Sequence, residues 1–312
     1  MKLSIILPVY NEEESVEELY RGIKEALKSP SFDYEIIAVN DGSKDKSLEV
    51  LKKIAGSDAK FKVVDFRRNY GQTAAISAGI DSAQGDILIP MDADLQNDPA
   101  DIPKFLEKID EGFDVVSGWR RDRKDNLKRR LPSQMANWLI SLITKVKLHD
   151  YGCTMKAYKR ETMKDIRFYG EMHRFMPAYI VWYGGKVAEI SVNHRPRKYG
   201  KAKYGFSRLF KVVLDLLTVK FLMTYLTKPI HFFGQIGIFM LFCGFLSGTG
   251  TLIYKFIFGI SLRTTQLPLL TVFFITIGIQ FILMGLLAEV LIRIYHEPQG
   301  RSPYVVKDKI NF

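Results

Sequence analysis

The sequence predicts an α/β protein with a Rossmann-like sheet, followed by membrane-associated helices. Three observations indicate this fold class. Short apolar stretches alternate with amphipathic ones over roughly the first hundred residues, which is the order of β-α-β units. Polar residues follow each apolar stretch, as they do at the carboxyl ends of strands in an open sheet. After residue 230, two further apolar stretches are each long enough to cross a bilayer.

The composition narrows the classes of function. The 312-residue chain carries a formal net charge of +11, which indicates an anionic partner such as nucleic acid, anionic lipid or a phosphorylated substrate. A disulfide between Cys153 and Cys243 is not expected, because Cys243 lies in an apolar stretch, and a reducing compartment is favoured. The apolar start of the chain is too short for a signal-peptide core and is interpreted as a first strand.

Four strands are predicted in order, with a helix after each of the first three. They lie at Leu3–Val9, Tyr34–Val39, Phe61–Phe66 and Ile87–Asp92, and a further strand is expected at Lys186–Val192. This alternation of strands and helices predicts parallel strands joined by right-handed crossovers. The four strands should therefore end on one edge of the sheet. The polar residues that this edge would collect are Asn11, Glu12, Asp41, Asn69, Asp92 and Asp94.

The fourth strand leads into two carboxylates and a carboxamide, at Asp92, Asp94 and Gln96. Oxygen ligands of this kind suit a divalent cation that shares its other positions with water and substrate phosphates. A strand that ends in a polar turn is the alternative interpretation. No Gly-x-Gly-x-x-Gly follows the first strand, and no Gly-x-x-x-x-Gly-Lys-Ser/Thr occurs. Hydride transfer and Walker-type chemistry are therefore disfavoured.

Four motifs stand at these strand ends. They are Pro-Val-Tyr-Asn-Glu at 8–12, Asn-Asp-Gly-Ser at 40–43, Arg-Asn-Tyr-Gly at 68–71 and Asp-Ala-Asp-Leu-Gln at 92–96. In this order they resemble the signature set of family 2 inverting glycosyltransferases with the GT-A fold. The resemblance is closest to the branch that includes dolichyl-phosphate mannose synthases and bactoprenol glucosyltransferases. It implies transfer of one sugar from a UDP- or GDP-linked donor to a polyprenyl phosphate, such as undecaprenyl or dolichyl phosphate.

The resemblance also implies roles for individual residues. Those expected to bind the nucleotide are Pro8, Tyr10, Glu12, Asp41, Asp92 and Ala93, with Asp41 accepting hydrogen bonds from the base. Those expected to hold Mg²⁺ or Mn²⁺ against the diphosphate are Asp92, Asp94 and Gln96. A cation there would neutralise the charge of the leaving nucleoside diphosphate. A phosphate acceptor is its own nucleophile, so it needs positioning more than a strong general base.

A basic stretch after residue 119 is a candidate site for the acceptor phosphate. Arg120 and Arg121 are expected nearest the cleft and Arg130 further along; a solvated, positive face beside the membrane is the alternative. Asp150 begins a segment that resembles the family's Asp-x-x-Ser-Gly-Phe-Arg pattern, and it would orient the acceptor or its arginine partners, or serve as an ordinary loop residue. The candidate catalytic residues are Asp94, Asp150, Arg120 and Arg121. His173 is a candidate phosphate or sugar ligand, with a structural role as the alternative.

A second basic segment, at 194–204, contains interleaved tyrosines. Such a pattern suits nucleic acid, but the membrane tail disfavours that partner. The segment resembles the family's Arg-x-x-Gly-x-Ser-Lys loop, which closes over the donor diphosphate. The matching basic residues are Arg197, Lys201 and Lys203, and Ala202 stands where serine is usual.

The membrane prediction begins with two amphipathic helices. One, over 131–144, could carry the lipid side of the site. The other, over 205–229, is expected in the membrane interface, with a long helix packed against protein as the alternative. Basic residues crowd the outer ends of the two apolar stretches, while their connection holds only Arg263. The positive-inside rule then places both termini and the catalytic domain in the cytoplasm of a multi-pass protein of the cell membrane.

The predicted domains are a catalytic domain over 1–204, a juxtamembrane helix over 205–229 and a transmembrane hairpin with a short cytoplasmic tail over 230–312. Small residues at 247–250 suit close helix contacts, so a homo-oligomer through the spans is a further expectation. Two alternatives remain. A processive polysaccharide synthase would need a Gln-x-x-Arg-Trp element and more spans, and the sequence has neither. A non-catalytic partner of a glycan flippase is disfavoured by the intact acidic residues of the four motifs.

Overall fold

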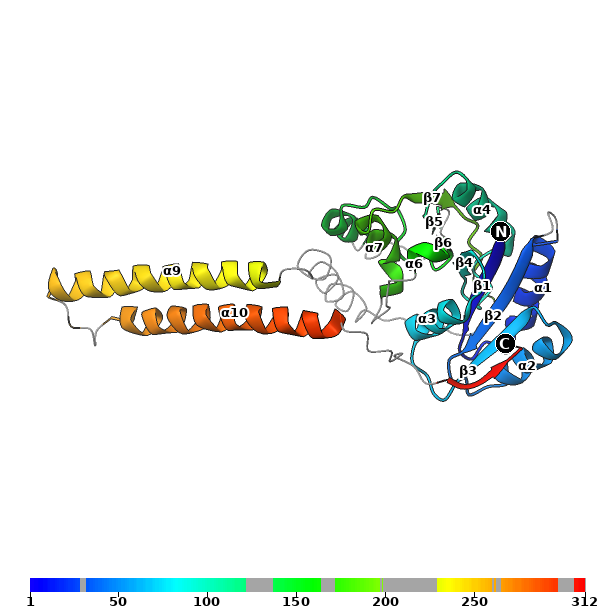
Figure 1. Ribbon diagram of the computed structural model, residues 1–312, viewed down its shortest axis with the longest axis horizontal. Helices are drawn as coiled ribbons and strands as arrows, with labels where there is room; N and C mark the ends of the chain where they lie inside the picture. The colour runs from blue at the N-terminus through cyan, green and yellow to red at the C-terminus, as the bar shows by residue number, and fades with distance from the viewer. Residues whose placement is uncertain are drawn as a thin grey trace. The chain divides into compact units, whose positions relative to one another are not determined.

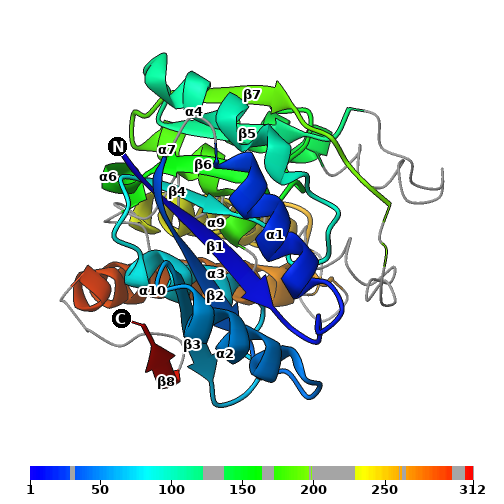
Figure 2. The same cartoon turned by 90° about the vertical axis from the view of Figure 1, so that its right-hand side faces the viewer.

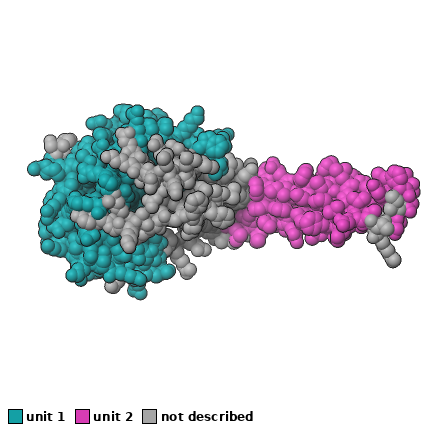
Figure 3. Space-filling view, turned by 180° about the vertical axis from the view of Figure 1, so that it is seen from behind, with its two compact units in different colours: residues 1–219, 302–312 teal, residues 220–301 magenta. Residues whose placement is uncertain are grey.

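The structure is a computed structural model, and it describes residues 1–28, 32–121, 137–163, 172–196, 198, 229–259, 261, 265–296 and 306–311. The chain divides into two compact units (Figure 3). Residues 1–219 and 302–312 form the first unit, and residues 220–301 form the second. The helix expected over 205–229 lies almost entirely outside the described residues.

Within the described residues, the first unit contains one eight-stranded sheet in the order β7-β5-β6-β4-β1-β2-β3-β8. Figure 2 shows this order from β7 at the top to β8 at the bottom. The four strands predicted first are β1 (Lys2–Val9), β2 (Asp33–Asn40), β3 (Phe61–Phe66) and β4 (Ile87–Pro90). They pair in parallel, as the alternation of strands and helices predicted.

Four more strands extend this parallel centre. They are β5 (Val115–Trp119), β6 (Lys156–Lys159), β7 (Val187–Ser191) and β8 (Val306–Ile310). β7 is the strand expected at 186–192, and it pairs in parallel with β5. β6 runs antiparallel between β4 and β5, and β8 runs antiparallel to β3, so the complete sheet is mixed. The sequence analysis did not predict β5, β6 or β8.

Helices cover both faces of the central strands. Those after the first strands are α1 (Val16–Ala26), α2 (Ser47–Ser57), α3 (Gln72–Ser82) and α4 (Ile102–Asp110). α1 and α2 lie on one face of the sheet and α3 on the other (Figure 1). The shorter elements are η1 (Pro99–Asp101), α6 (Arg160–Met163), η2 (Met172–Arg174) and α7 (Met176–Trp182).

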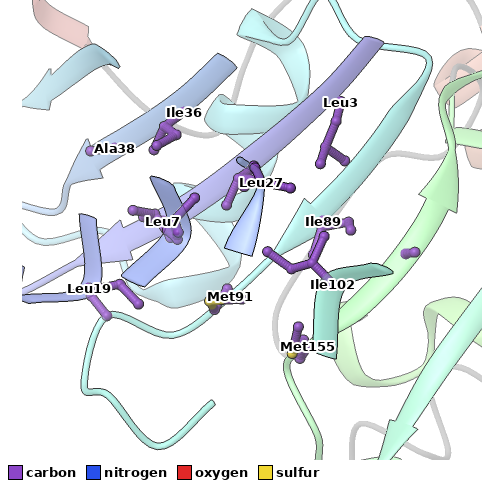
Figure 4. Close-up of a cluster of buried hydrophobic side chains, with 14 of the residues drawn as sticks. Leu3, Leu7, Leu19, Leu27, Ile36, Ala38, Ile89, Met91, Ile102 and Met155 are labelled. Atoms are coloured by element: carbon purple, nitrogen blue, oxygen red, sulfur yellow. The ribbon is translucent and has the colours of Figure 1, made fainter. Parts of the chain in front are cut away.

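The core follows from the alternation of side chains along β1. Leu3 and Leu7 point into a buried apolar cluster with Leu19 of α1 and Ile102 of α4 (Figure 4). Ile6 faces the other way, toward α3, where a Cβ on Gly79 would lie 2.3 Å from its Cγ2 atom. A strand that is buried on both faces is mostly apolar, and Ser4, the polar residue between Leu3 and Val9, is hydrogen-bonded to Glu35.

β8 closes the β3 edge of the sheet. It follows the second apolar helix in the chain, where the sequence analysis expected only a tail. The Asn311 side chain fastens its end by donating Nδ2–H bonds to the carbonyl oxygens of Ala55, at 2.7 Å, and Phe61, at 3.0 Å. An edge strand that is paired in this way no longer exposes a row of unpaired backbone groups.

The second unit is a hairpin of α9 (Pro229–Phe256) and α10 (Leu267–His296), which occupy the two predicted apolar stretches. Two segments within them, Ile230–Phe256 and Leu267–Ala288, are long and apolar enough to cross a membrane. Only 11% of the most apolar window of each is buried, so large apolar side chains cover their outer surface. Such a surface requires apolar surroundings.

The helices of this hairpin approach each other closely at small residues. A Cβ on Gly237 would lie 2.8 Å from the Gly278 carbonyl oxygen. Ser247 accepts a hydrogen bond from the Thr271 hydroxyl at 3.1 Å and donates one to the Leu267 carbonyl at 3.1 Å. Ser247, from the stretch expected to join separate copies, therefore makes contacts within one chain, and an oligomer stays a prediction.

Candidate active site at the carboxyl edge of the sheet

The loop after β4 fixes two carboxylates at the carboxyl edge of the sheet. Met91, Ala93 and Leu95 are buried, so alternate residues anchor the loop in the core and leave Asp92 and Asp94 half-buried. Leu95 has a φ of 62°, a left-handed conformation that is costly for a bulky side chain. The turn that it makes brings the Gln96 backbone N–H to Asp94 Oδ1, at 3.1 Å.

Asp92 receives hydrogen bonds on both oxygens from residues that the sequence analysis did not identify. Gln72 donates from Nε2 to Oδ1 at 2.7 Å, and the Thr154 hydroxyl donates to Oδ2 at 2.8 Å. Burial and the neighbouring Asp94 carboxylate raise the pKa of Asp92 to about 6. The two carboxylates repel each other, and a bound cation would relieve this repulsion.

The oxygen ligands of this loop fit Mg²⁺ or Mn²⁺. Asp92, Asp94 and Gln96 lie in one loop after β4, and their role as metal ligands stays a prediction. In the part of the chain that the structure describes, no group of three or more His, Cys, Asp or Glu residues could enclose a metal ion. The loop offers fewer oxygen ligands than an octahedral cation coordinates, so it suits an open site, where the cation takes further ligands from water and substrate phosphates.

Asp41 joins two of the sequence motifs. Its Oδ1 and Oδ2 atoms accept the backbone N–H groups of Tyr70, at 2.6 Å, and Gly71, at 3.0 Å. Burial raises the pKa of Asp41, and these two hydrogen bonds partly oppose that effect. Gly42 has a φ of 64°, and a Cβ there would lie 2.4 Å from the Arg68 carbonyl carbon. The geometry thus assigns Asp41 a structural part in the loop; its expected contact with the base stays a prediction.

The first motif is fastened to the start of α2. Asn11, with a φ of 55°, donates its N–H to Ser43 Oγ at 3.0 Å. The Glu12 N–H binds Ser47 Oγ at 2.8 Å, and its carboxylate accepts the Ser15 hydroxyl at 3.0 Å. Pro8 lies beside these contacts at the end of β1. Two further nucleotide-binding candidates lie at the same edge of the sheet. They are Tyr10, in the first motif, and Ala93, in the loop after β4.

On the opposite side of the Asp92 loop, Arg120 and Asp150 form a bidentate ion pair. Arg120 Nε lies 2.7 Å from Asp150 Oδ2, and Nη2 lies 2.9 Å from Oδ1. The side chains are only 13% and 6% exposed, so the pair is shielded from solvent. Burial lowers the pKa of Arg120, but the hydrogen bonds that it donates to Asp150 outweigh this effect, and the net pKa is raised. Arg121 is exposed, with its guanidinium 5.8 Å from the Trp119 ring. Asp150 thus orients an arginine, one of its two proposed roles.

One loop links the ion pair to the carboxylates. Residues 150–156 carry Asp150 at one end and Thr154 near the other. Lys156 is 1% exposed, and its ammonium donates to the carbonyl oxygens of Tyr151, at 3.3 Å, and Cys153. Burial lowers the pKa of Lys156. The buried Lys156 ammonium therefore fixes the shape of this loop. Both the Asp92 carboxylate and the Arg120 guanidinium depend on that shape.

The second basic segment begins beside the Asp92 loop. The Arg195 N–H binds the Gln96 carbonyl at 2.9 Å, and its guanidinium pairs with Asp98 at 2.7 Å. His194 and Asn97 form an isolated antiparallel β-bridge through their backbones. The remaining basic candidates lie outside the described residues: Arg130, Arg197, Lys201 and Lys203.

His173 is buried, and its Nδ1 atom lies 2.7 Å from the Thr73 hydroxyl. It lines a small hollow together with Thr154 and Tyr158. The contact with Thr73 favours the structural role for His173 over the ligand role, and the hollow places it next to the loop that holds Asp92.

Comparison with known proteins agrees with this geometry. The sequence model of the family "Glycosyl transferase family 2" matches residues 4–167. The chain is 40% identical to a dodecaprenyl-phosphate galacturonate synthase of Rhizobium johnstonii, over 98% of this chain and 92% of the relative. It is 37% identical to an undecaprenyl-phosphate 4-deoxy-4-formamido-L-arabinose transferase of Shewanella sediminis, over 98% of this chain and 92% of the relative.

Among solved structures, the chain is similar to glucosyl-3-phosphoglycerate synthase of Mycobacterium tuberculosis in a complex with Mn²⁺ and UDP. The TM-score is 0.55 at 19% identity, over 70% of this chain and 79% of that chain. The same enzyme is similar to this chain in a complex with Mg²⁺ and UDP, also with a TM-score of 0.55. At this identity the likeness shows the fold alone, and it confirms the predicted GT-A architecture. The chain belongs to glycosyl transferase family 2, as its four motifs predicted.

Proposed function

We propose that this chain transfers one sugar, with inversion, from a nucleotide-sugar to a polyprenyl phosphate such as undecaprenyl phosphate. The observation that carries the proposal is the arrangement of the site. One loop, residues 150–156, supports both Asp92, through Thr154, and Arg120, through Asp150, in a chain with two candidate membrane spans. The names of the relatives, which specify polyprenyl-phosphate acceptors, support it.

Each half of the site has a separate task. Asp92 and Asp94 would hold Mg²⁺ or Mn²⁺, with Gln96 beside them. When bound, the cation neutralises the charge on the departing nucleoside diphosphate. Arg120, oriented by Asp150, binds the acceptor phosphate and offsets its repulsion from the donor. The acceptor phosphate oxygen attacks the anomeric carbon as the bond to the diphosphate breaks. Because this oxygen is already ionised at pH 7, no protein group has to remove a proton.

The acceptor side also has an apolar surface. Residues 137–144 form a helix, within the range predicted to be amphipathic, whose Trp138 and Leu142 side chains are exposed. Asn137 holds this helix to the His149 carbonyl, at 2.8 Å, next to Asp150. We propose that this exposed face meets the lipid part of the acceptor.

The proposed location is the cell membrane, with the site on the cytoplasmic side. β1 precedes the two candidate spans in the chain and β8 follows them, yet both strands belong to one sheet. Two crossings return the chain to its starting side, so a sheet built from both ends agrees with two spans. The basic residues at the outer ends of the spans support a cytoplasmic position.

The test is transfer of radiolabelled sugar by the full chain in detergent. UDP- and GDP-linked sugars are offered with undecaprenyl or dodecaprenyl phosphate and with Mg²⁺ or Mn²⁺. Product should form with at least one pair. The variant Asp94→Ala should lose about 10³-fold or more of the rate, because several kcal/mol of charge stabilisation are removed. Asp110→Ala, at the exposed end of α4, is the matched control and should keep full activity. Full transfer by Asp94→Ala would refute the mechanism.

A further inference from the structure

The strongest unexplained feature of the site is the pair of hydrogen bonds on Asp92. Gln72 is the first residue of α3, and Thr154 precedes β6, so the two donors come from elements on different sides of the carboxylate in the chain. The donor atoms lie at 2.7 Å and 2.8 Å, one on each carboxylate oxygen. Neither residue belongs to the four motifs.

Two donors on opposite oxygens fix the plane of a carboxylate. The terminal torsion of aspartate is intrinsically broad, so a carboxylate without such partners samples many orientations. Each carboxylate oxygen can accept two hydrogen bonds or ligands. In the described part of the chain, the bonds from Gln72 and Thr154 therefore leave a further acceptor position on each oxygen of Asp92, in a defined direction.

The donors are also neutral, which matters for a cation site. Two positive side chains, Arg120 and Lys156, act on Asp92 electrostatically. Their hydrogen bonds go elsewhere, to Asp150 and to the Tyr151 and Cys153 carbonyls. The amide and the hydroxyl hold the carboxylate in place without cancelling its charge, so its attraction for a divalent cation is kept.

We propose that Gln72 and Thr154 are positioning residues for the divalent cation, acting through Asp92. The inference rests on the proposed function, since it assumes that the Asp92 loop binds a metal. Outer hydrogen-bond partners of metal ligands typically change metal affinity by about 10- to 100-fold. Because Thr154 lies on the loop that also holds Asp150, the cation site and the acceptor arginine share one support.

The experiment measures Mn²⁺ binding directly, by electron paramagnetic resonance of free Mn²⁺, with the full chain in detergent and UDP present. Gln72→Ala and Thr154→Val should each weaken Mn²⁺ binding about 10- to 100-fold. Thr154→Ser keeps the hydroxyl and should restore wild-type binding. Thr162→Val removes a hydroxyl that bonds only the Lys159 carbonyl among the described partners and serves as the matched control.

Steady-state kinetics separate positioning from general damage. In Gln72→Ala and in Thr154→Val, the KM for Mn²⁺ should rise by a larger factor than kcat at saturating Mn²⁺ falls. A cooperative thermal unfolding transition shows that each variant is folded. Gln72 and Thr154 lie on different elements, so either variant alone tests the idea. Wild-type protein that binds no Mn²⁺ would overturn the proposed function together with this inference. Mn²⁺ binding in the wild type that is unchanged in Gln72→Ala or Thr154→Val would overturn the inference alone.

Discussion

The proposed donor side and the proposed acceptor side of the site are built in different ways. On the proposed donor side, short motifs directly after β1, β2 and β3 are hydrogen-bonded to one another, as Asp41 is to the backbone N–H groups of Tyr70 and Gly71. On the acceptor side, a single ion pair between Arg120 and Asp150 depends on one long loop. Parallel strands bring their ends together whatever the loops contain. The donor side is thus determined by the sheet, whereas the acceptor side is determined by the contacts of one segment.

The largest effect that would test this contrast is expected from Asp150→Ala. The change leaves the buried Arg120 guanidinium without its partner, and breaking such a pair costs about 3–5 kcal/mol. We expect a lower Tm and a strongly raised KM for polyprenyl phosphate. UDP binding, measured by titration without a divalent cation, should change much less, because the hydrogen bonds that hold the motifs after β1 and β2 involve neither residue of the pair. Weakened UDP binding equal to the loss of acceptor binding would show that the two sides are not separate.

A smaller change is expected from Arg120→Lys. Lysine keeps the positive charge but cannot make the two parallel hydrogen bonds that arginine makes with Asp150. Loss of one charge-assisted hydrogen bond costs about 1.5–3 kcal/mol, so the KM for the acceptor should rise about tenfold or more. The KM for the nucleotide-sugar should stay constant in the same assay. Arg121→Lys, at an exposed position, is the matched comparison. A larger effect of that change would indicate that the acceptor phosphate binds Arg121 instead of Arg120.

The smallest effect on transfer is expected far from the site, at Glu35. Its carboxylate accepts hydrogen bonds from the Ser4 hydroxyl at 2.6 Å and the Gln84 backbone N–H at 2.6 Å, and it pairs with Lys62 at 2.8 Å. Burial alone would raise the pKa of Glu35, but Lys62, Ser4 and Gln84 outweigh it and lower the pKa below its ordinary value of 4.5.

A lowered pKa stabilises the fold at pH values above 4.5, and this stabilisation disappears as the pH falls through the folded-state pKa. Glu35→Gln should therefore lower the free energy of unfolding near pH 7 by about 1.5–3 kcal/mol. The loss of Tm on acidification below pH 4.5 should also be shallower than in the wild type. Neither KM should change at pH 7. An altered KM would show that the site responds to the whole sheet and not only to its carboxyl edge.

Sequence reasoning succeeded where function depends on residues that directly follow strands. The four motifs, the parallel centre and the two apolar helices were all predicted, because each has a local pattern. It failed where the structure depends on contacts between distant residues of ordinary type. Gln72 lies outside the four motifs, and Thr154, which departs from the family pattern of its segment, is separated from Asp92 by 62 positions. β6 is only four residues long, and its antiparallel pairing has no signal in its own sequence.

The pairing of β8 with β3 has a consequence for biosynthesis. The ribosome completes β1 to β7 before either apolar helix emerges, and β8 emerges only after both. During that interval the β3 edge stays open, and open edges are where sheets join one another wrongly. β8 therefore covers the β3 edge only after both candidate spans have been made, so completion of the sheet depends on prior synthesis of the hairpin.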